Sequence, residues 1–79
     1  MSNLIMYNRI FIECFEIKET DLNDSLIYNS IETWDSIGHM AMIAELEDAF
    51  DIMIDTEDVI DFNSYEKGKS ILAKYDIEI

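Results

Sequence analysis

The chain has 79 residues, 49% of them apolar, and one cysteine, Cys14. A chain of this length forms one domain, residues 1–79, near the lower limit at which a hydrophobic core suffices for stability. A single cysteine excludes an internal disulfide, and we expect a protein of the reducing cytoplasm.

Eighteen acidic residues against five basic ones give a net charge of −13, and no Lys or Arg occurs between Lys18 and Lys67. Nucleic acid is excluded as a partner because binding a phosphate backbone needs clustered cations. An anionic membrane surface would repel the chain. The sequence also lacks an apolar run of membrane-spanning length and the pattern of a signal peptide. Proteins with basic patches would be attracted instead.

The first predicted helix covers about residues 3–15. Its apolar side chains recur at helical spacing and form one predicted core stripe: Leu4, Tyr7, Phe11, Cys14 and Phe15. Cys14 is therefore interpreted as a core thiol. Residues 17–35 follow as an irregular connection with turn-forming residues and apolar anchors, among them Leu26 and Trp34. Trp34 is expected to hold this connection against the end of the bundle, with contact to a group attached to the chain or to a partner as the alternative. Loops of this length in a compact domain are uncommon and often functional.

Three more helices are predicted, over about residues 36–50, 57–61 and 64–75. The third has Thr56 or Asp55 as its cap. The fourth begins at Asn63 or Ser64, and Glu66 stands at the capping-box spacing from Asn63. The sequence therefore predicts an all-α fold, a four-helix bundle with a long first loop and a short third helix.

The helix at 36–50 has two apolar faces. At about 100° per residue, one face is a normal core stripe: His39, Met42, Ile43, Leu46, Ala49 and Phe50. A second face gathers further small or apolar side chains behind a serine and is closed by two carboxylates: Ser36, Ile37, Met40, Ala41, Ala44, Glu47 and Asp48. Such a strip is typical of a docking surface. The alternative is a central helix packed on both sides.

Ser36 stands at the start of this helix, where its hydroxyl, like the carboxylate of Asp35, is suited to capping free N–H groups. The same N–H groups and the helix dipole would favour a phosphate attached there. His39 is the only histidine, and it leans toward the core stripe. A hydrolase would also need a glycine-rich elbow or an oxyanion loop, which the sequence lacks. Ser36 is therefore interpreted as a substrate for modification, and the chain as a protein without catalytic residues of its own.

The segment from Trp34 to Met40 resembles the Asp-Ser-Leu attachment motif of acyl carrier proteins and peptidyl carrier domains. The resemblance covers essentially the whole chain and continues through Ile43, Leu46, Glu47, Phe50, Ile54 and the segment Thr56-Glu57-Asp58-Val59. It implies an acyl-carrier-like bundle in which Ser36 is esterified by 4′-phosphopantetheine from coenzyme A. The thiol of that arm would hold acyl or aminoacyl intermediates as thioesters.

The resemblance also implies partners. These are a phosphopantetheinyl transferase and acyl or aminoacyl ligases or transferases with basic patches, acting on a monomeric carrier. The face that they would read includes one residue of the third helix besides those of the second: Asp35, Ile37, Met40, Ala41, Ala44, Glu47, Asp48 and Val59.

The chain departs from the family pattern at two positions of the motif. Ile37 replaces the usual Leu, and Gly38 stands in the first helical turn, where glycine costs about 1 kcal/mol relative to alanine. Gly38 either lets the arm or a partner come close or is simply tolerated. The motif is more similar to dedicated stand-alone carriers of specialised pathways than to the housekeeping fatty-acid carrier. Such carriers serve surface polysaccharides, aminoacyl transfer, or lipid or secondary-metabolite biosynthesis. Asp24-Ser25-Leu26 matches the attachment motif literally, but no long two-faced helix follows Ser25, so Ser36 is preferred.

The acidic composition is compatible with two other interpretations. An acidic helical interaction adaptor without a covalent arm would explain the charge and the fold. A calcium loop beginning at Asp51 fails because Met53 and Thr56 occupy the third and sixth positions of the EF-hand pattern. His39 lacks the partners that zinc needs, so no metal site is predicted.

Overall fold

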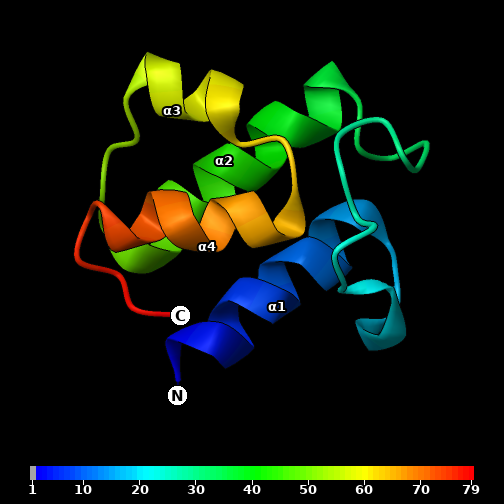
Figure 1. Ribbon diagram of the computed structural model, residues 1–79, viewed down its shortest axis with the longest axis horizontal. Coiled ribbons are helices and arrows are strands. Elements are labelled where there is room, and N and C mark those ends of the chain that lie inside the picture. Colours follow the sequence, from blue (N-terminus) through cyan, green and yellow to red (C-terminus); the bar gives the residue numbers. More distant parts are fainter. Residues whose placement is uncertain (1) are drawn as a thin grey trace.

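The computed structural model describes residues 2–79. Its elements are α1 (Asn3–Phe15), a short 3₁₀ turn (Glu19–Asp21), α2 (Ser36–Phe50), α3 (Thr56–Asp61) and α4 (Tyr65–Ala73). The all-α prediction is confirmed for these residues, in which extended pairing is limited to an isolated bridge between Ile27 and Ser64. In Figure 1, α2 and α4 cross in the middle of the view, with α1 below them and α3 above. Within residues 2–79, no helix is long and apolar enough to cross a membrane.

The observed helix bounds agree with the predicted bounds more closely in the N-terminal half of the chain than in the C-terminal half. α1 and α2 have the expected bounds, and α3 begins one residue earlier than expected. α4 begins at Tyr65 because the hydroxyl of Ser64, rather than the side chain of Asn63, accepts the first free N–H, that of Lys67 at 2.9 Å. It ends at Ala73, and the chain turns back three residues later at Asp76, whose φ is 65°. Residue 1 of the expected domain lies outside the described residues.

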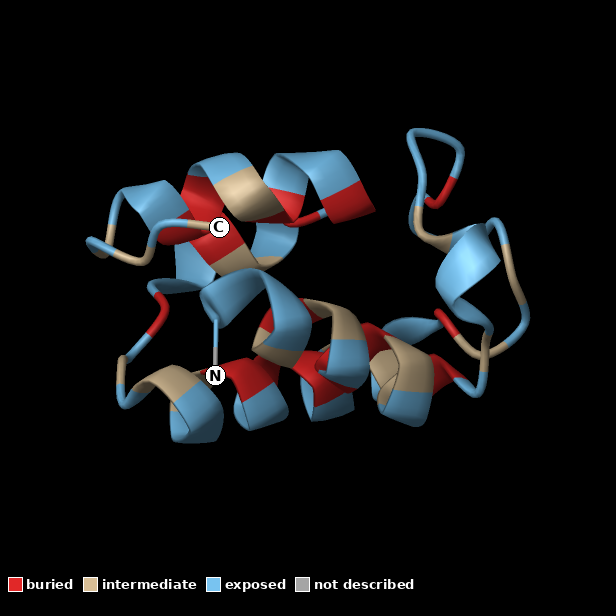
Figure 2. Cartoon of the chain, turned by 90° about the horizontal axis from the view of Figure 1, so that it is seen from below, coloured by how far each residue is buried: buried red, intermediate tan, exposed pale blue. Residues whose placement is uncertain are grey.

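The core is built around aromatic rings from α1, the long connection, the end of α3 and α4. The ring of Phe11 lies at its centre, with centroids of neighbouring rings 4.9–6.3 Å away: Tyr7, Phe15, Trp34, Phe62 and Tyr65. Figure 2 shows the buried positions turned toward the interior between the helices. Aromatic rings bury much area with little loss of side-chain freedom, which suits a domain of this size.

Two details of the predicted stripes are wrong, both at helix ends. Leu4 is 40% exposed and Ala49 is exposed, whereas Ile10 is buried. Leu4 and Ala49 have the angular position of the core stripes, but Leu4 lies in the first turn of α1 and Ala49 in the last turn of α2, and both of these helix ends are open to solvent. Cys14 is half-buried rather than fully in the core, and burial raises the pKa of its thiol.

A buried carboxylate fastens α3 to the end of α4. Asp58 is 5% exposed and accepts hydrogen bonds from Lys74 Nζ at 2.6 Å and from the Tyr75 hydroxyl. The Tyr75 oxygen in turn accepts the N–H of Asp55 at 2.9 Å. The bonds from Lys74 and Tyr75 hold the pKa of Asp58 below its ordinary value, and the same contacts raise the pKa of both partners.

The lowered pKa of Asp58 fixes the pH range over which this network stabilises the fold. The stabilisation is fully present above the ordinary carboxyl pKa of about 3.9 and is lost as the pH falls through the lower folded value. Asp58→Asn is therefore expected to lower the urea midpoint at about pH 7, and the difference from the wild type should shrink below about pH 3.5. Asp61→Asn, which changes an exposed carboxylate of the same helix, is the control. Equal midpoints for Asp58→Asn and the wild type at neutral pH would contradict this role.

Candidate functional site

The residues before α2 are fixed to the end of α1. Thr33 Oγ1 donates a hydrogen bond to the backbone oxygen of Phe15 at 2.7 Å. Trp34 is 0% exposed, and its ring stacks on that of Phe15 with centroids 5.0 Å apart. The expectation that Trp34 holds the connection against the bundle agrees with this packing, and its burial leaves no surface for direct contact with a partner. The residues that lead into α2 are therefore held against the end of α1.

The sequence offers both Asp35 and Ser36 as the cap of α2, and the structure gives this role to Asp35. The Asp35 carboxylate accepts the N–H of Gly38 at 2.8 Å and is the cap of α2. Ser36 is the first helical residue and is exposed. Because Asp35 caps the helix, the Ser36 hydroxyl is not needed for that bond.

Gly38 is required by the backbone itself. A Cβ at this position would lie 1.9 Å from the carbonyl oxygen of Thr33. The interpretation that glycine is simply tolerated here is therefore wrong: its lack of a side chain lets the end of the connection pass against the first turn of α2. This close approach brings the anchored Thr33 next to the helix that begins with Ser36.

His39 joins three elements through its two ring nitrogens. The indole N–H of Trp34 donates to Nδ1 at 3.0 Å, so Nδ1 is the unprotonated nitrogen. Nε2 then carries the proton and donates it to the backbone oxygen of Val59 at 2.8 Å. Both nitrogens are thus engaged within the protein, and neither is left to accept a proton from Ser36.

The two faces of α2 differ in exposure as the sequence predicted. On the core side Met42, Ile43 and Leu46 are buried, whereas His39 and Phe50 are half-buried. On the other side Ile37 is 80% and Met40 is 55% exposed. The remaining members of this outward strip are also exposed: Ser36, Ala41, Ala44 and Asp48. The alternative of a helix packed on both sides is therefore wrong.

Glu47 differs from its expected place on the rim of the strip. It is half-buried, and its carboxylate accepts the N–H of Ile54 at 2.9 Å, across the turn between α2 and α3. The sequence could not show this bond because it depends on how the chain returns after Phe50. Asp48 remains exposed beside the strip.

A groove of about 270 Å³ opens next to Ser36, between α2 and α3. It is lined mainly by apolar side chains: Tyr28, Ser36, His39, Met40, Val59, Ile60, Phe62 and Asn63. Val59 is half-buried in this lining, whereas its neighbour Ile60 is 73% exposed and carries the outward apolar surface of α3.

Val59 is predicted from the sequence as part of the site, whereas Tyr28 and Ile60 are not. In a six-residue helix the Val59-Ile60 pair was the only signal, and it could not tell which residue faces outward. Tyr28 reaches the groove because its N–H donates to the Asn63 oxygen at 2.8 Å, clipping the long connection to the junction of α3 and α4. The ring of Tyr28 then lies 5.6 Å from that of His39.

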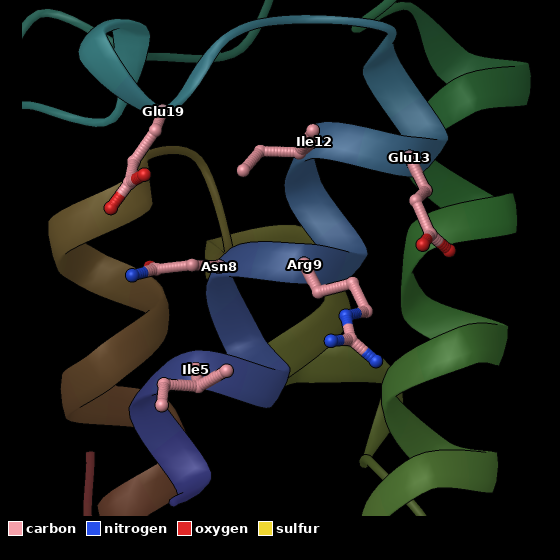
Figure 3. Close-up of a pocket in the computed structure, with 6 residues that line it drawn as sticks. All are labelled: Ile5, Asn8, Arg9, Ile12, Glu13 and Glu19. Carbon is pink, nitrogen blue, oxygen red and sulfur yellow. The ribbon is translucent and has the colours of Figure 1, made fainter.

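A larger hollow of about 360 Å³ lies on the outer side of α1 and shares no lining residue with the groove. Ile5, Asn8 and Ile12 lie along it, with Arg9 and Glu13 on one side and Glu19 on the other (Figure 3). The hollow carries charges of both signs, and the side-chain oxygen of Asn8 already accepts a hydrogen bond from the Tyr65 hydroxyl. Among residues 2–79, no three His, Cys, Asp or Glu side chains come together in a way that could hold a metal ion.

The second candidate serine lies in a different environment. Ser25 lies in a turn that Asn23 closes with two hydrogen bonds. The side-chain oxygen of Asn23 accepts the N–H of Ser25 at 2.8 Å, and its backbone oxygen accepts the N–H of Leu26 at 3.0 Å. Leu26 is buried, and the chain continues into the bridge of Ile27 with Ser64. No helix therefore follows Ser25, and no outward apolar strip begins there.

Comparison with protein-family models, curated proteins and solved structures finds no match to this chain.

The close approach at Gly38 predicts an unusual sign for a glycine-to-alanine change. In an open helical position the change would stabilise by about 1 kcal/mol. Here Gly38→Ala should lower the free energy of unfolding by about 1–3 kcal/mol, because the added methyl group forces the Thr33 carbonyl away. Urea melts measure the difference. Ala41→Gly is the matched control and should cost only the helix propensity, about 1 kcal/mol. A more stable Gly38→Ala variant would mean that the backbone does not approach as described.

Proposed function

We propose that this chain is a carrier protein of the acyl-carrier type, with an acyl-carrier-like bundle. Ser36 would carry 4′-phosphopantetheine, and the thiol of that arm would hold acyl or aminoacyl intermediates as thioesters for partner enzymes of a specialised biosynthetic pathway in the cytoplasm. One observation carries the proposal: an exposed serine, relieved of capping by Asp35, stands where an outward apolar strip and an apolar groove meet. The resemblance of the Trp34–Met40 segment to the attachment motif supports it.

The attachment chemistry fits this position. The Ser36 oxygen would attack the phosphorus of coenzyme A that bears the pantetheine. A phosphodiester forms, the pyrophosphate bond breaks, 3′,5′-ADP leaves and the serine proton passes to a base of the transferase. The reaction requires a hydroxyl that a partner enzyme can reach, and Ser36 is exposed. The resulting phosphate would lie at the start of α2, where the helix dipole and free N–H groups favour negative charge.

The serine is better suited to be a substrate of other enzymes than to be a catalyst. Its nearest histidine, His39, uses one nitrogen on Trp34 and the other on Val59. General-base activation of Ser36 would require breaking one of these bonds. We therefore assign the chemistry of loading and transfer to partner enzymes, and we assign no metal or catalytic residue to this chain.

The outward strip is the proposed docking surface for these partners. Ile37 and Met40 supply exposed apolar area next to Ser36, and the flexible thioether of Met40 can repack against different surfaces. The exposed carboxylates of Asp35 and Asp48 flank them within a stretch of 48 residues that has no Lys or Arg. Partners with basic patches would be steered to this side of a monomeric carrier.

A second candidate is an acidic helical adaptor that binds partners through the same strip without a covalent arm. The exposure of Ile37 and Met40 favours it equally well. The adaptor function gives no reason why the serine at the head of the strip should be free of a capping role. Whether Ser36 is modified therefore separates the two functions.

Modification at Ser36 is tested by intact mass. Incubation with coenzyme A and a phosphopantetheinyl transferase of broad specificity should add one phosphopantetheine group to the wild type. Ser36→Ala should abolish the added mass, because the attacking oxygen is gone. Ser25→Ala, the matched control in the other Asp-Ser segment, should retain it. Modification that persists in Ser36→Ala, or an unmodified wild type, would contradict the carrier assignment.

Electrostatic steering predicts a salt dependence of the same reaction. The rate of modification should fall roughly tenfold as salt rises from low to physiological ionic strength, since exposed charges are screened over about 8–10 Å. Asp48→Lys should slow the reaction at low salt without lowering the denaturation midpoint, because Asp48 is exposed. Glu13→Lys makes the same charge change on α1 and should have the smaller effect. Equal rates for the two variants would argue against the strip as the docking surface. Glu47 is unsuitable for this test because it bonds to Ile54.

A further inference from the structure

The inner side of the groove beside Ser36 is closed by His39. Its ring lies between the long connection and α3, accepting the indole N–H of Trp34 at 3.0 Å and donating to the Val59 oxygen at 2.8 Å. The second bond ties the backbone of α3 to α2 across the inner edge of the groove, whose lining includes both His39 and Val59. His39 therefore stands between the groove and the interior, beside the buried ring of Phe62, which lines the same groove.

The space beneath His39 is filled by packed rings. Phe62 and Trp34 are both 0% exposed, with their ring centroids 6.2 and 6.3 Å from that of His39. Both rings also pack against Phe11 at the centre of the core. A chain entering from the groove would have to displace His39, and it would leave the buried Trp34 N–H without an acceptor. Unpaired buried donors are strongly disfavoured.

The groove itself is small. Its volume of about 270 Å³ is below the roughly 300–1,000 Å³ of pockets that enclose drug-sized ligands. Its outer edges are formed by Tyr28, Met40 and Ile60, all of them exposed. It can cover part of the arm or a short acyl group, whereas the remainder of a long apolar chain would stay in water, which is unfavourable for each exposed methylene.

We propose that His39 determines the cargo class by keeping the interior closed, so that this carrier holds short acyl or aminoacyl groups at its surface rather than long fatty acyl chains in its core. This inference rests on the proposed attachment of the arm at Ser36. Within that function His39 is a positioning residue: it does not touch the thioester, and it acts by joining α2, α3 and Trp34.

The test uses three forms of the carrier, loaded in one step by a transferase from acetyl-, hexanoyl- or dodecanoyl-coenzyme A. Intact mass first establishes the loading, and absence of loading would overturn the proposed function and this inference with it. In the loaded wild type, nuclear Overhauser contacts of the dodecanoyl chain should be confined to residues that line the groove, chiefly the exposed Tyr28, Met40 and Ile60. The single tryptophan, Trp34, is the reporter of the interior, and its indole protons should show no contact with the chain. The acetyl and dodecanoyl thioesters should react with hydroxylamine at equal rates.

Removal of the bridge should open the interior. In His39→Ala the dodecanoyl chain should contact Trp34, and its thioester should react about tenfold more slowly than the acetyl thioester, as burial of two methylenes would give. Met53→Ala, which changes an exposed methionine outside the groove and the outward strip and leaves the bridge intact, should behave as the wild type. His39→Phe separates loss of the hydrogen bonds from loss of volume and serves as the second variant if His39→Ala does not fold. Contacts between the dodecanoyl chain and Trp34 in the loaded wild type would overturn the inference, whatever the variants do.

Discussion

The burial of Trp34 is the constraint on which the rest of the structure depends. A ring of this size supplies much of the core of so small a chain, but its N–H must find an acceptor inside the protein. His39 Nδ1 is that acceptor, and this bond fixes which nitrogen of His39 is protonated. The other nitrogen then has a proton to give, and the Val59 carbonyl accepts it. One buried indole thus determines the start of α2, the orientation of His39 and the position of α3.

α3 illustrates how a short helix is held without a core of its own. Its six residues are too few for a stable isolated helix, since helix formation is cooperative and short helices are marginal in water. Two sets of hydrogen bonds hold α3 in place instead. His39 fastens the Val59 carbonyl from α2, and Asp58 fastens the helix to Lys74 and Tyr75. Between these attachments Ile60 is left exposed, so the same helix that closes the groove also offers apolar surface at its rim.

α2 contributes apolar side chains both to the core and to the exposed surface. Its core face contributes Met42, Ile43 and Leu46 to the interior, whereas Ile37 and Met40 remain in water on the other face. In a chain near the lower size limit for a self-sufficient core, leaving such side chains exposed removes stabilisation that burial would provide. The aromatic cluster around Phe11 offsets that loss. The high negative charge opposes self-association through the exposed strip, and in the proposed function it would attract basic partners.

The sequence by itself determined the helical class, the bounds of α1 and α2, and the two faces of α2, because these depend on local spacing of apolar residues and on capping side chains. It also singled out Ser36. Only the tertiary structure decided which residues surround that serine: Tyr28 and Ile60 enter the groove through long-range contacts that no local period records. The same is true of Gly38, whose necessity comes from the carbonyl of Thr33, and of Glu47, whose carboxylate is used on Ile54. Spacing along a helix tells which way a side chain points, but only the packed chain shows what it meets there.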